Sequence, residues 1–146
     1  MNVKDILASK ASSIVSFIGR DDGVTAAVRF VCDNRIGSLL VQDEKGEPVG
    51  IITERDILRG INTNITNIGS LSVSDVMTHD LICGLLEDDV NYIMQIMTKN
   101  RIRHLPMVHR KKVVGLISIG DVINCSLEET RVENHRLHDY LQLSGE

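Results

Sequence analysis

The sequence predicts an α/β fold built from two tandem copies of one small repeat. Three observations support this prediction. Apolar residues at helical spacing occur in two places, each helical pattern is followed by two short apolar runs typical of strands, and the second of these runs carries nearly the same residues in both places. Together they indicate a duplicated β-α-β-β-α unit with a short leading helix.

An apolar stripe at positions i, i+3, i+4 and i+7 predicts the main helix of each copy. The two stripes consist of Val24, Ala27, Val28 and Val31 and of Val90, Ile93, Met94 and Met97. Carboxylates precede both stripes, and negative charge near the first turn favours a helix start. The tripeptide Asn-Arg-Ile follows both helices, which supports a true duplication.

A hairpin of two strands is predicted after each main helix. Apolar runs at 38–41 and 105–108 are each followed by a polar turn of a length typical of hairpins. The next strand begins with Val-Gly in both copies, at Val49 and Val114. Another helix is predicted to follow each of these strands.

The matches also predict how the chain is divided. Similar residues at 3–7 and 73–77 predict a leading helix for each copy. A three-stranded sheet with helices on one face cannot bury its other face alone, so we expect the two copies to pack sheet to sheet as a pseudo-twofold pair. The predicted parts are a first repeat, a linker rich in Asn, Thr, Ser and Gly, a second repeat and a helical tail, at residues 1–60, 61–72, 73–127 and 128–146.

Composition excludes several classes of function. The net charge of −4 lacks the excess of Lys and Arg that nucleic acids and anionic membranes attract, so neither is an expected partner. No apolar run approaches the roughly 20 residues of a membrane span. The three cysteines are an odd number and lie far apart, which fits neither a disulfide framework nor a zinc site and predicts a reducing cytoplasm. The histidines show no metal-ligand spacing, and no metal is expected.

The repeats resemble the CBS domain family, which is named after cystathionine β-synthase. The hallmark Gly-apolar-apolar-Ser/Thr-x-x-Asp of this family occurs at 50–56 and 115–121, and the Val-x-Asp segment that opens each repeat occurs at 3–7 and 73–77. The sequence from Arg103 to Pro106 resembles the start of the middle strand in the family. The resemblance covers residues 1–127 and implies a stand-alone CBS pair, a non-catalytic homodimer that binds an adenosine-containing ligand and regulates another protein.

The residue chemistry at the two hallmark segments suits such a ligand. Thr53 and Ser118 each stand where a strand ends and a helix begins, and the first amides of that helix are free to bind an anion or a hydroxyl. Asp56 and Asp121 follow three positions later, and a carboxylate can accept both vicinal hydroxyls of a ribose. The alternative is a capping box, in which the same four side chains only cap helices. The two roles overlap, because a capping oxygen can also contact a ligand.

The resemblance implies two pockets, each combining residues of both repeats. The first pocket joins Thr53 and Asp56 to the adenine contacts Ile82 and Cys83, and the second joins Ser118, Gly120 and Asp121 to Ser16 and Phe17. Cationic side chains should make the pockets unequal. Arg103 and His104 precede the middle strand of the second repeat, and Arg103 offers a fixed cation to a phosphate. We therefore expect tighter binding at Asp121; Arg55 supplies charge to the first pocket or is simply a solvated helix residue.

The expected ligands are AMP, ADP, ATP or NAD(H), and the expected role is sensing of energy or redox state. S-adenosyl compounds belong to the same adenosine class and differ in having no phosphate. One alternative function is a protein interaction or scaffold module with degenerate pockets. Another is an enzyme that acts on a nucleotide, although the sequence shows no phosphate-loop lysine, nucleophile motif or metal cluster.

Overall fold

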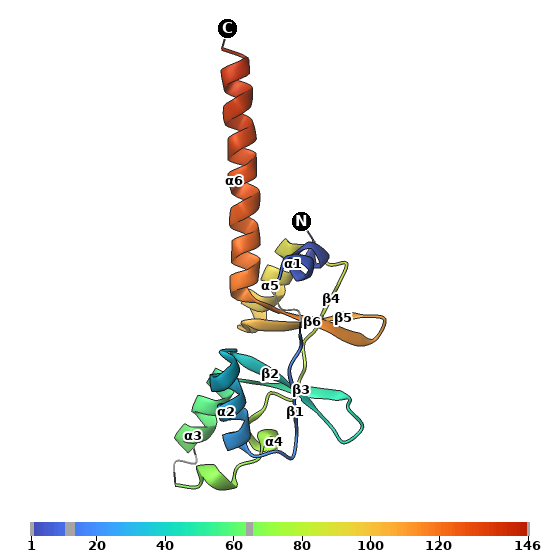
Figure 1. Cartoon of the computed structure of the whole chain (residues 1–146), viewed down its shortest axis with the longest axis vertical. Helices are drawn as coiled ribbons and strands as arrows, with labels where there is room; N and C mark the ends of the chain where they lie inside the picture. The colour runs from blue at the N-terminus through green and yellow to red at the C-terminus, as the bar shows by residue number, and fades with distance from the viewer. Residues whose placement is uncertain (1, 11–13, 64–65, 146) are drawn as a thin grey trace. The chain divides into compact units, whose positions relative to one another are not determined.

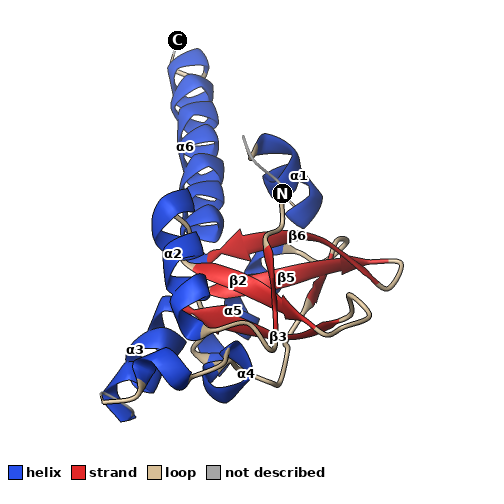
Figure 2. Cartoon of the chain, turned by 60° about the horizontal axis from the view of Figure 1, so that its bottom comes forward, coloured by secondary structure: helices blue, strands red, loops and turns tan. Residues whose placement is uncertain are grey.

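The computed structural model describes residues 2–10, 14–63 and 66–145 and confirms the α/β class (Figure 1). The chain divides into two compact units. The N-terminal unit falls within Ile14–Ile82, and the C-terminal unit falls within Met1–Ser13 and Cys83–Glu146. Each unit contains one three-stranded sheet, and Figure 2 distinguishes these strands from the helices by colour.

The sheet of the N-terminal unit has the strand order β1-β2-β3. Its strands are β1 (Phe17–Gly19), β2 (Ser38–Gln42) and β3 (Pro48–Thr53). β1 runs parallel to β2, whereas β2 and β3 form the predicted antiparallel hairpin. The central strand β2 is buried from Ser38 to Val41, which explains its continuous apolar run.

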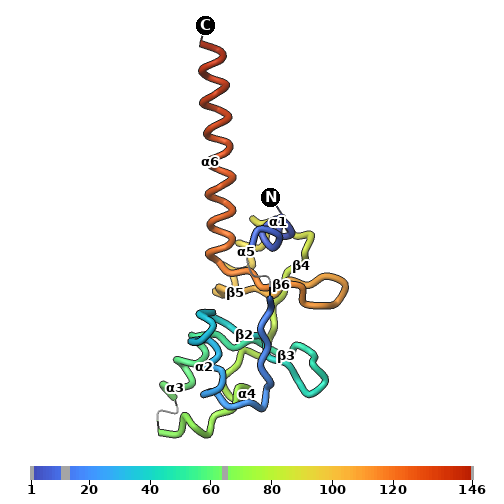
Figure 3. The backbone as a smooth tube through the Cα atoms, in the orientation of Figure 1, coloured from blue at the N-terminus to red at the C-terminus, as the bar shows by residue number. Residues whose placement is uncertain are grey.

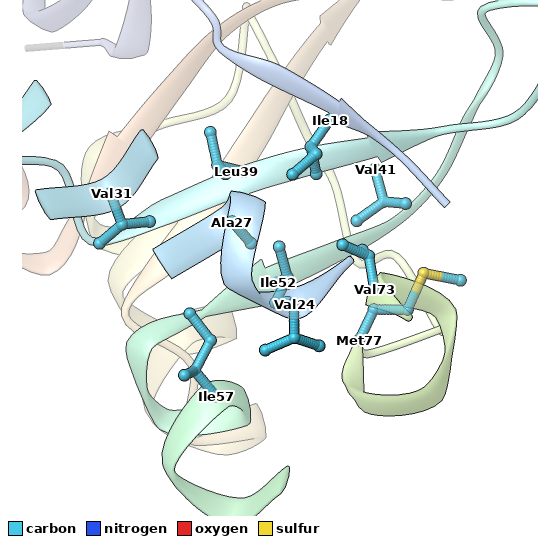
Figure 4. Packing of buried hydrophobic residues seen from close by; sticks show 10 residues of the cluster. All are labelled: Ile18, Val24, Ala27, Val31, Leu39, Val41, Ile52, Ile57, Val73 and Met77. Atoms are coloured by element: carbon cyan, nitrogen blue, oxygen red, sulfur yellow. The ribbon is translucent and has the colours of Figure 1, made fainter. Parts of the chain in front are cut away.

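Helices α2 (Val24–Asn34) and α3 (Glu54–Thr63) pack on this sheet. Figure 4 shows Val24, Ala27 and Val31 of α2 directed at side chains of β2 and β3, as the apolar stripe predicts. The short helices η1 (Ile68–Ser70) and α4 (Val73–Val76) follow α3. Val73 and Met77 belong to the same buried cluster, so α4 completes the core of the N-terminal unit.

The C-terminal unit repeats this plan. Its sheet has the order β4-β5-β6, with β4 (Gly84–Leu85) parallel to β5 (His104–His109) and β5 antiparallel to β6 (Lys112–Ser118). Helices α5 (Val90–Asn100) and α6 (Ile119–Leu143) belong to the unit, together with α1 (Val3–Ser9) from the beginning of the chain. α1 lies so close to β6 that a Cβ atom on Gly115 would be 2.6 Å from Leu7 Cδ2.

The compact units therefore exchange the leading helices of the sequence repeats. α1 opens the first repeat but packs in the C-terminal unit, and its Val3 amide donates to Asp88 O at 3.3 Å. α4 opens the second repeat but packs in the N-terminal unit, where the Val73 amide donates to Asp22 O at 2.8 Å. Residues just after a leading helix, such as Lys10 and Thr78, consequently lie in the unit of the other repeat.

The repeated tripeptide Asn-Arg-Ile ends both main helices. Arg35 and Arg101 have φ angles of 52° and 54°, the left-handed conformation that commonly terminates a helix. The next amide turns back to the helix, so that Ile36 donates to Val31 O at 3.2 Å and Ile102 donates to Met97 O at 3.0 Å. The tripeptide recurs because both copies need the same helix stop.

Two predicted boundaries differ from the structure. The sequence predicts the second polar turn at 109–112, but His109 and Lys112 pair with each other, so the turn between β5 and β6 consists only of Arg110 and Lys111. Both of these residues have positive φ, as two-residue hairpin turns often require. The predicted tail is also not a separate segment, since α6 runs without interruption from Ile119 to Leu143 (Figure 3).

Candidate functional site

The junction of β6 and α6 forms the first part of the candidate site. Ser118 is the N-cap of α6, and its Oγ accepts a hydrogen bond from the Asp121 amide at 3.2 Å. In return, the Ser118 amide donates to Asp121 Oδ2 at 2.8 Å. This reciprocal pair is a capping box, and it fixes the carboxylate of Asp121 beside the start of the helix.

The junction of β3 and α3 has the same arrangement. The Thr53 amide and hydroxyl donate to Asp56 Oδ2 at 2.9 and 3.0 Å, and the Asp56 amide donates to Thr53 Oγ1 at 3.2 Å. Both pairs therefore cap helices, as the alternative interpretation predicted. A ligand can use these residues only through the lone pairs that capping leaves available.

Asp56 has few lone pairs left for a ligand. Besides the two bonds from Thr53, its Oδ1 accepts a hydrogen bond from Thr78 Oγ1 at 3.1 Å. Thr78 follows α4 and pairs with Ile51 of β3 through bonds of 2.8 and 3.0 Å. The residue Asp56 is only 7% exposed. Its carboxylate is thus enclosed and held by three donors.

Asp121 has a different environment. Lys10 Nζ lies 2.8 Å from Asp121 Oδ2 and also donates to Leu116 O at 2.9 Å. Burial alone would raise the pKa of the Asp121 carboxyl, but the hydrogen bonds and charge of Lys10 and the hydrogen bonds of Ser118 together hold this pKa below its ordinary value. Within residues 2–10, 14–63 and 66–145, Asp121 Oδ1 accepts no hydrogen bond.

The sequence analysis missed Lys10 and Thr78. Both residues follow a leading helix, and the exchange of leading helices brings each of them to a carboxylate of the other repeat. A sequence signal exists in hindsight, because the opening segments 3–7 and 73–77 are part of the family pattern and the residues just after them have a defined place in the fold. The two side chains differ, however, because Lys10 gives Asp121 a cationic partner whereas Thr78 gives Asp56 a hydroxyl.

The sequence places Arg103 and His104 before the middle strand of the second repeat, and the structure begins that strand, β5, at His104. His104 is the first residue of β5 and pairs with Ser118 in the sheet, and Arg103 O accepts a hydrogen bond from the Ile119 amide at 2.8 Å. The Arg103 side chain is exposed, whereas His104 is half-buried. The backbone thus brings both residues to the start of α6.

The corresponding position in the N-terminal unit is Ser38, which pairs with Thr53 in the sheet. Ser38 is 3% exposed, and its hydroxyl has no hydrogen-bond partner among the residues that the structure describes. A buried hydroxyl without a partner is uncommon in folded proteins. Arg55, on the first turn of α3, is exposed.

The predicted adenine contacts lie at strand β1 and before strand β4. Ser16 O accepts a hydrogen bond from the Leu40 amide at 3.0 Å, and the half-buried Phe17 begins β1. Ile82 is half-buried and Cys83 is exposed. Gly120 is exposed on the first turn of α6. The approach of these residues to a ligand stays a prediction.

An open surface pocket of about 510 Å³ lies beside Asp56 in the N-terminal unit. Helices α3 and α4 supply most of its wall. Thr78, which binds the Asp56 carboxylate, also borders this pocket. The lining residues are Asp56, Arg59, Gly60, Asn62, Thr63, Asp75, Val76, Met77 and Thr78.

Among residues 2–10, 14–63 and 66–145, no three His, Cys, Asp or Glu side chains gather in a way that could hold a metal ion. In the same part of the chain, no helix combines the length and apolar character needed to cross a membrane.

Comparisons with known proteins place these features in a family. A family model for the CBS domain matches residues 3–63 and, a second time, residues 73–128. The chain is 38% identical over 147 residues to CBS domain-containing protein CBSX3, mitochondrial, of Arabidopsis thaliana, and the match covers 96% of this chain and 71% of that protein.

Solved structures show the same fold. The CBS-domain containing protein ATU1752 from Agrobacterium tumefaciens has a TM-score of 0.80 at 32% identity, with 84% of this chain and 91% of that chain covered. The CBS domain pair of protein MJ0100, in complex with 5′-methylthioadenosine and S-adenosyl-L-methionine, has a TM-score of 0.75 at 26% identity, with 86% of this chain and 98% of that chain covered.

Proposed function

This chain belongs to the CBS-domain family, and we propose that it is a regulatory module that binds an adenosine-containing ligand beside Asp121. The observation that carries the proposal is the carboxylate of Asp121. It is held in position by Ser118, it is partly exposed, and its Oδ1 has no donor within the described residues. The CBS pair of MJ0100, whose fold this chain shares, binds two adenosine compounds, which supports the same ligand class here.

The ribose is the part of the ligand that Asp121 would recognise. A carboxylate accepts hydrogen bonds, and the lowered pKa of Asp121 keeps it ionised at neutral pH. Its Oδ1 can accept a ribose hydroxyl without breaking the capping box, which uses Oδ2. The N-terminus of α6 adds partial positive charge nearby and favours an electronegative ligand group.

Lys10 would supply the contact to a charged group of the ligand. An ammonium group has three donors, and Lys10 uses two of them on Leu116 O and Asp121 Oδ2. The third donor would bind a phosphate oxygen, and Arg103, whose carbonyl accepts from the Ile119 amide at the start of α6, would be a second cation. This arrangement favours AMP, ADP, ATP or NAD(H) within the adenosine class, whereas S-adenosyl compounds would use the ribose contact alone. The adenine contacts Ser16 and Phe17 stay a prediction from the family resemblance.

We propose weaker binding at the junction of the N-terminal unit. The Asp56 carboxylate is enclosed and already accepts three hydrogen bonds, so a ribose would have to displace Thr78 or share Oδ1 with it. Ile82, Cys83 and Arg55 are the further contacts proposed for this site. A site that binds no ligand at this junction would favour the interaction-module function for the N-terminal unit.

The regulatory role completes the proposal. Ligand binding would favour one arrangement of the module, which a regulated protein would recognise, and the chain itself would catalyse no reaction. We propose a homodimer that senses energy or redox state. We also propose the cytoplasm as its compartment, because the cysteines Cys32, Cys83 and Cys125 form no disulfide in the structure. The Arabidopsis relative is mitochondrial by its name, and the mitochondrion is the other compartment to test.

Binding measured on the intact chain tests the proposal. The chain is titrated by calorimetry with AMP, ADP, ATP, NAD⁺, NADH, S-adenosylmethionine, 5′-methylthioadenosine and GTP, and Tm is recorded with each ligand. A ligand at about 100 times its Kd should stabilise the fold by about 2.7 kcal/mol, which raises Tm by a few degrees in a domain of this size. Adenosine ligands should produce this effect, and GTP should not.

The matched variants are Asp121→Ala and Asp5→Ala. Asp5 forms a capping box with Asn2 at the start of α1 in the same unit, so the control loses a similar helix cap without touching the β6–α6 junction. Asp121→Ala should weaken ligand binding at least tenfold, whereas Asp5→Ala should leave the affinity unchanged. Equal affinities in the two variants, or no binding of any adenosine ligand, would reject the proposal.

A further inference from the structure

Helix α6 extends far beyond the body of the C-terminal unit (Figures 1 and 3). Its first turns are anchored, since Val122 and Cys125 are buried and α6 packs against α5, α1 and β6. From Leu127 onwards, all residues through Gly145 except the half-buried Glu129 are exposed. This outer part is about 25 Å long at 1.5 Å per residue.

The exposed part of α6 carries an apolar seam with heptad spacing. The residues of this seam, which we call the α6 stripe, follow one another at alternating steps of four and three. They are Ile123, Leu127, Thr130, Asn134, Leu137 and Leu141. The four apolar members are 47%, 53%, 56% and 67% exposed in chain order. A stripe with this spacing is the seam of a coiled coil, whose heptad is lettered abcdefg. Leu127, Asn134 and Leu141 occupy position a of successive heptads, and the other three residues occupy position d.

The α6 stripe is not the face that packs on the chain's own unit. Helical geometry places the stripe about a third of a turn away from the buried residues Val122 and Cys125. An isolated helix of this length is marginal in water unless an apolar face is covered. We therefore propose that α6 pairs with α6 of a second copy of this chain, side by side and in the same direction, along the α6 stripe.

The polar members of the stripe point to an identical partner. In a parallel pair in register, Asn134 faces the same residue of the second copy, and the two amides can bond to each other. A single Asn at an a position favours a two-stranded coiled coil and fixes its register. Thr130 Oγ1 donates to Ser126 O at 3.0 Å within its own helix, so its hydroxyl enters the seam with its donor already satisfied.

The charges beside the stripe favour the parallel direction. In that direction Glu133, at a g position, lies beside His138 of the second copy, at an e position, where a carboxylate can accept a hydrogen bond from an imidazole. An antiparallel pair can also match its apolar residues, with Leu127 opposite Leu137 and Ile123 opposite Leu141. That arrangement, however, places Glu133 beside Glu133 of the second copy on one side of the seam, and Arg131 beside Arg131 of the second copy on the other side. Both contacts are between like charges, which repel.

Disulfide cross-linking of the full chain tests the pairing and its direction. The background carries Cys32→Ser, Cys83→Ser and Cys125→Ala, so that only an introduced thiol can react. Leu141→Cys adds a thiol on the stripe, and Arg136→Cys adds one on an exposed position off the stripe. Mild oxidation should link most of the Leu141→Cys chains into covalent dimers and leave the Arg136→Cys chains monomeric on a non-reducing gel.

Two results would overturn the proposal. One is equal cross-linking of Leu141→Cys and Arg136→Cys, or none in either. The other is a link that requires Ile123→Cys together with Leu141→Cys, which would mean an antiparallel pair. A second measurement is sedimentation equilibrium of Leu137→Glu against Val132→Glu, an exposed apolar position off the stripe. Leu137→Glu should raise the dimer Kd at least tenfold over Val132→Glu, and an equal Kd would reject the seam.

Discussion

Lys10 Nζ and Asp121 Oδ2 lie 2.8 Å apart, although 111 positions of sequence separate the two residues. The equivalent carboxylate of the other unit, Asp56, is bound instead by the hydroxyl of Thr78 at 3.1 Å. The two halves of a duplicated fold thus use the same capping box but give it a cationic partner in one unit and a neutral partner in the other. The first three predictions concern this difference.

The ion pair should make the free energy of unfolding depend on pH in the acid range. Because the pKa of folded Asp121 is depressed, its contribution to stability is present above the unfolded pKa of about 3.9 and is lost as pH falls through the folded value. Lys10→Met should remove much of this contribution. The free energy of unfolding, measured with urea at pH 7 and pH 3, should therefore fall less between these pH values in Lys10→Met than in the natural chain.

The control for this prediction is Lys4→Met, which removes an exposed lysine of α1. Its pH dependence should equal that of the natural chain. An unchanged pH dependence in Lys10→Met would mean that the ion pair with Asp121 does not operate in solution.

Lys10 should also separate ligands that carry phosphate from ligands that do not. If its third donor binds phosphate, Lys10→Met should weaken AMP or ATP about tenfold or more, because a charge-assisted hydrogen bond contributes about 1.5–3 kcal/mol. Binding of 5′-methylthioadenosine, which has no phosphate, should change little. Calorimetric titration of both compounds measures the difference. Tighter binding of both ligands to the variant would instead show that Lys10 competes with the ribose for Asp121.

Asp56 should matter more for stability than for ligand binding. Asp56→Ala leaves the Thr53 amide and the Thr78 hydroxyl without their acceptor in a buried place, which should cost about 1–3 kcal/mol of unfolding free energy. Thr78→Val should cost about 1 kcal/mol, since it removes one donor of the carboxylate. Urea denaturation of both variants and of the double variant gives the coupling between the two side chains.

Thr98→Val is the control for Thr78→Val. The Thr98 hydroxyl donates only to Met94 O on an exposed part of α5. Its loss should change the unfolding free energy by less than about 0.5 kcal/mol. A coupling energy near zero between Asp56 and Thr78 would contradict the structural role assigned to their hydrogen bond.

The two equivalent strand glycines should respond differently to substitution. A Cβ atom on Gly50 would lie 2.5 Å from Thr78 O, whereas one on Gly115 would lie 2.6 Å from Leu7 Cδ2. A leucine side chain can rotate away, but a carbonyl paired with Ile51 cannot. Gly50→Ala should therefore cost about 1–3 kcal/mol and more than Gly115→Ala. Thermal and urea denaturation compare the two.

Gly120→Ala serves as the reference, because its Cβ atom would meet nothing closer than Ser118 Oγ at 3.6 Å. This substitution should be neutral or slightly stabilising, since alanine is favoured over glycine in a helix. If Gly115→Ala costs more than Gly50→Ala, then α1 is held against β6 more rigidly than the segment after α4 is held against β3.

Much of the fold follows from local patterns. The stripe that begins at Val24 is a helix whose apolar face is buried, and its equivalent at Val90 is another. Asn-Arg-Ile ends each helix through bonds to carbonyls within the preceding turns. The turn predicted at 109–112 is two residues longer than the observed one, because residue types alone do not show how far two strands remain paired.

The candidate site was only partly predictable. Ser118 and Asp121 were identified, but their pattern fits a cap and a ligand site equally well, and the structure shows the cap. Lys10 was missed because its role depends on where α1 packs. Ser38 was assigned no role, and the absence of a partner for its hydroxyl emerges only when the packed surroundings are known.

The sequence by itself determined the duplication, the α/β class and the places where carboxylates meet helix starts. These features depend on periodicity and on hydrogen bonds between residues three or four positions apart, and such information is contained in short stretches of chain. Only the tertiary structure decided that α1 and α4 change units, that Asp121 pairs with Lys10 and that Asp56 pairs with Thr78. Those contacts join segments 111 and 22 positions apart, and the packing of the whole core selects them.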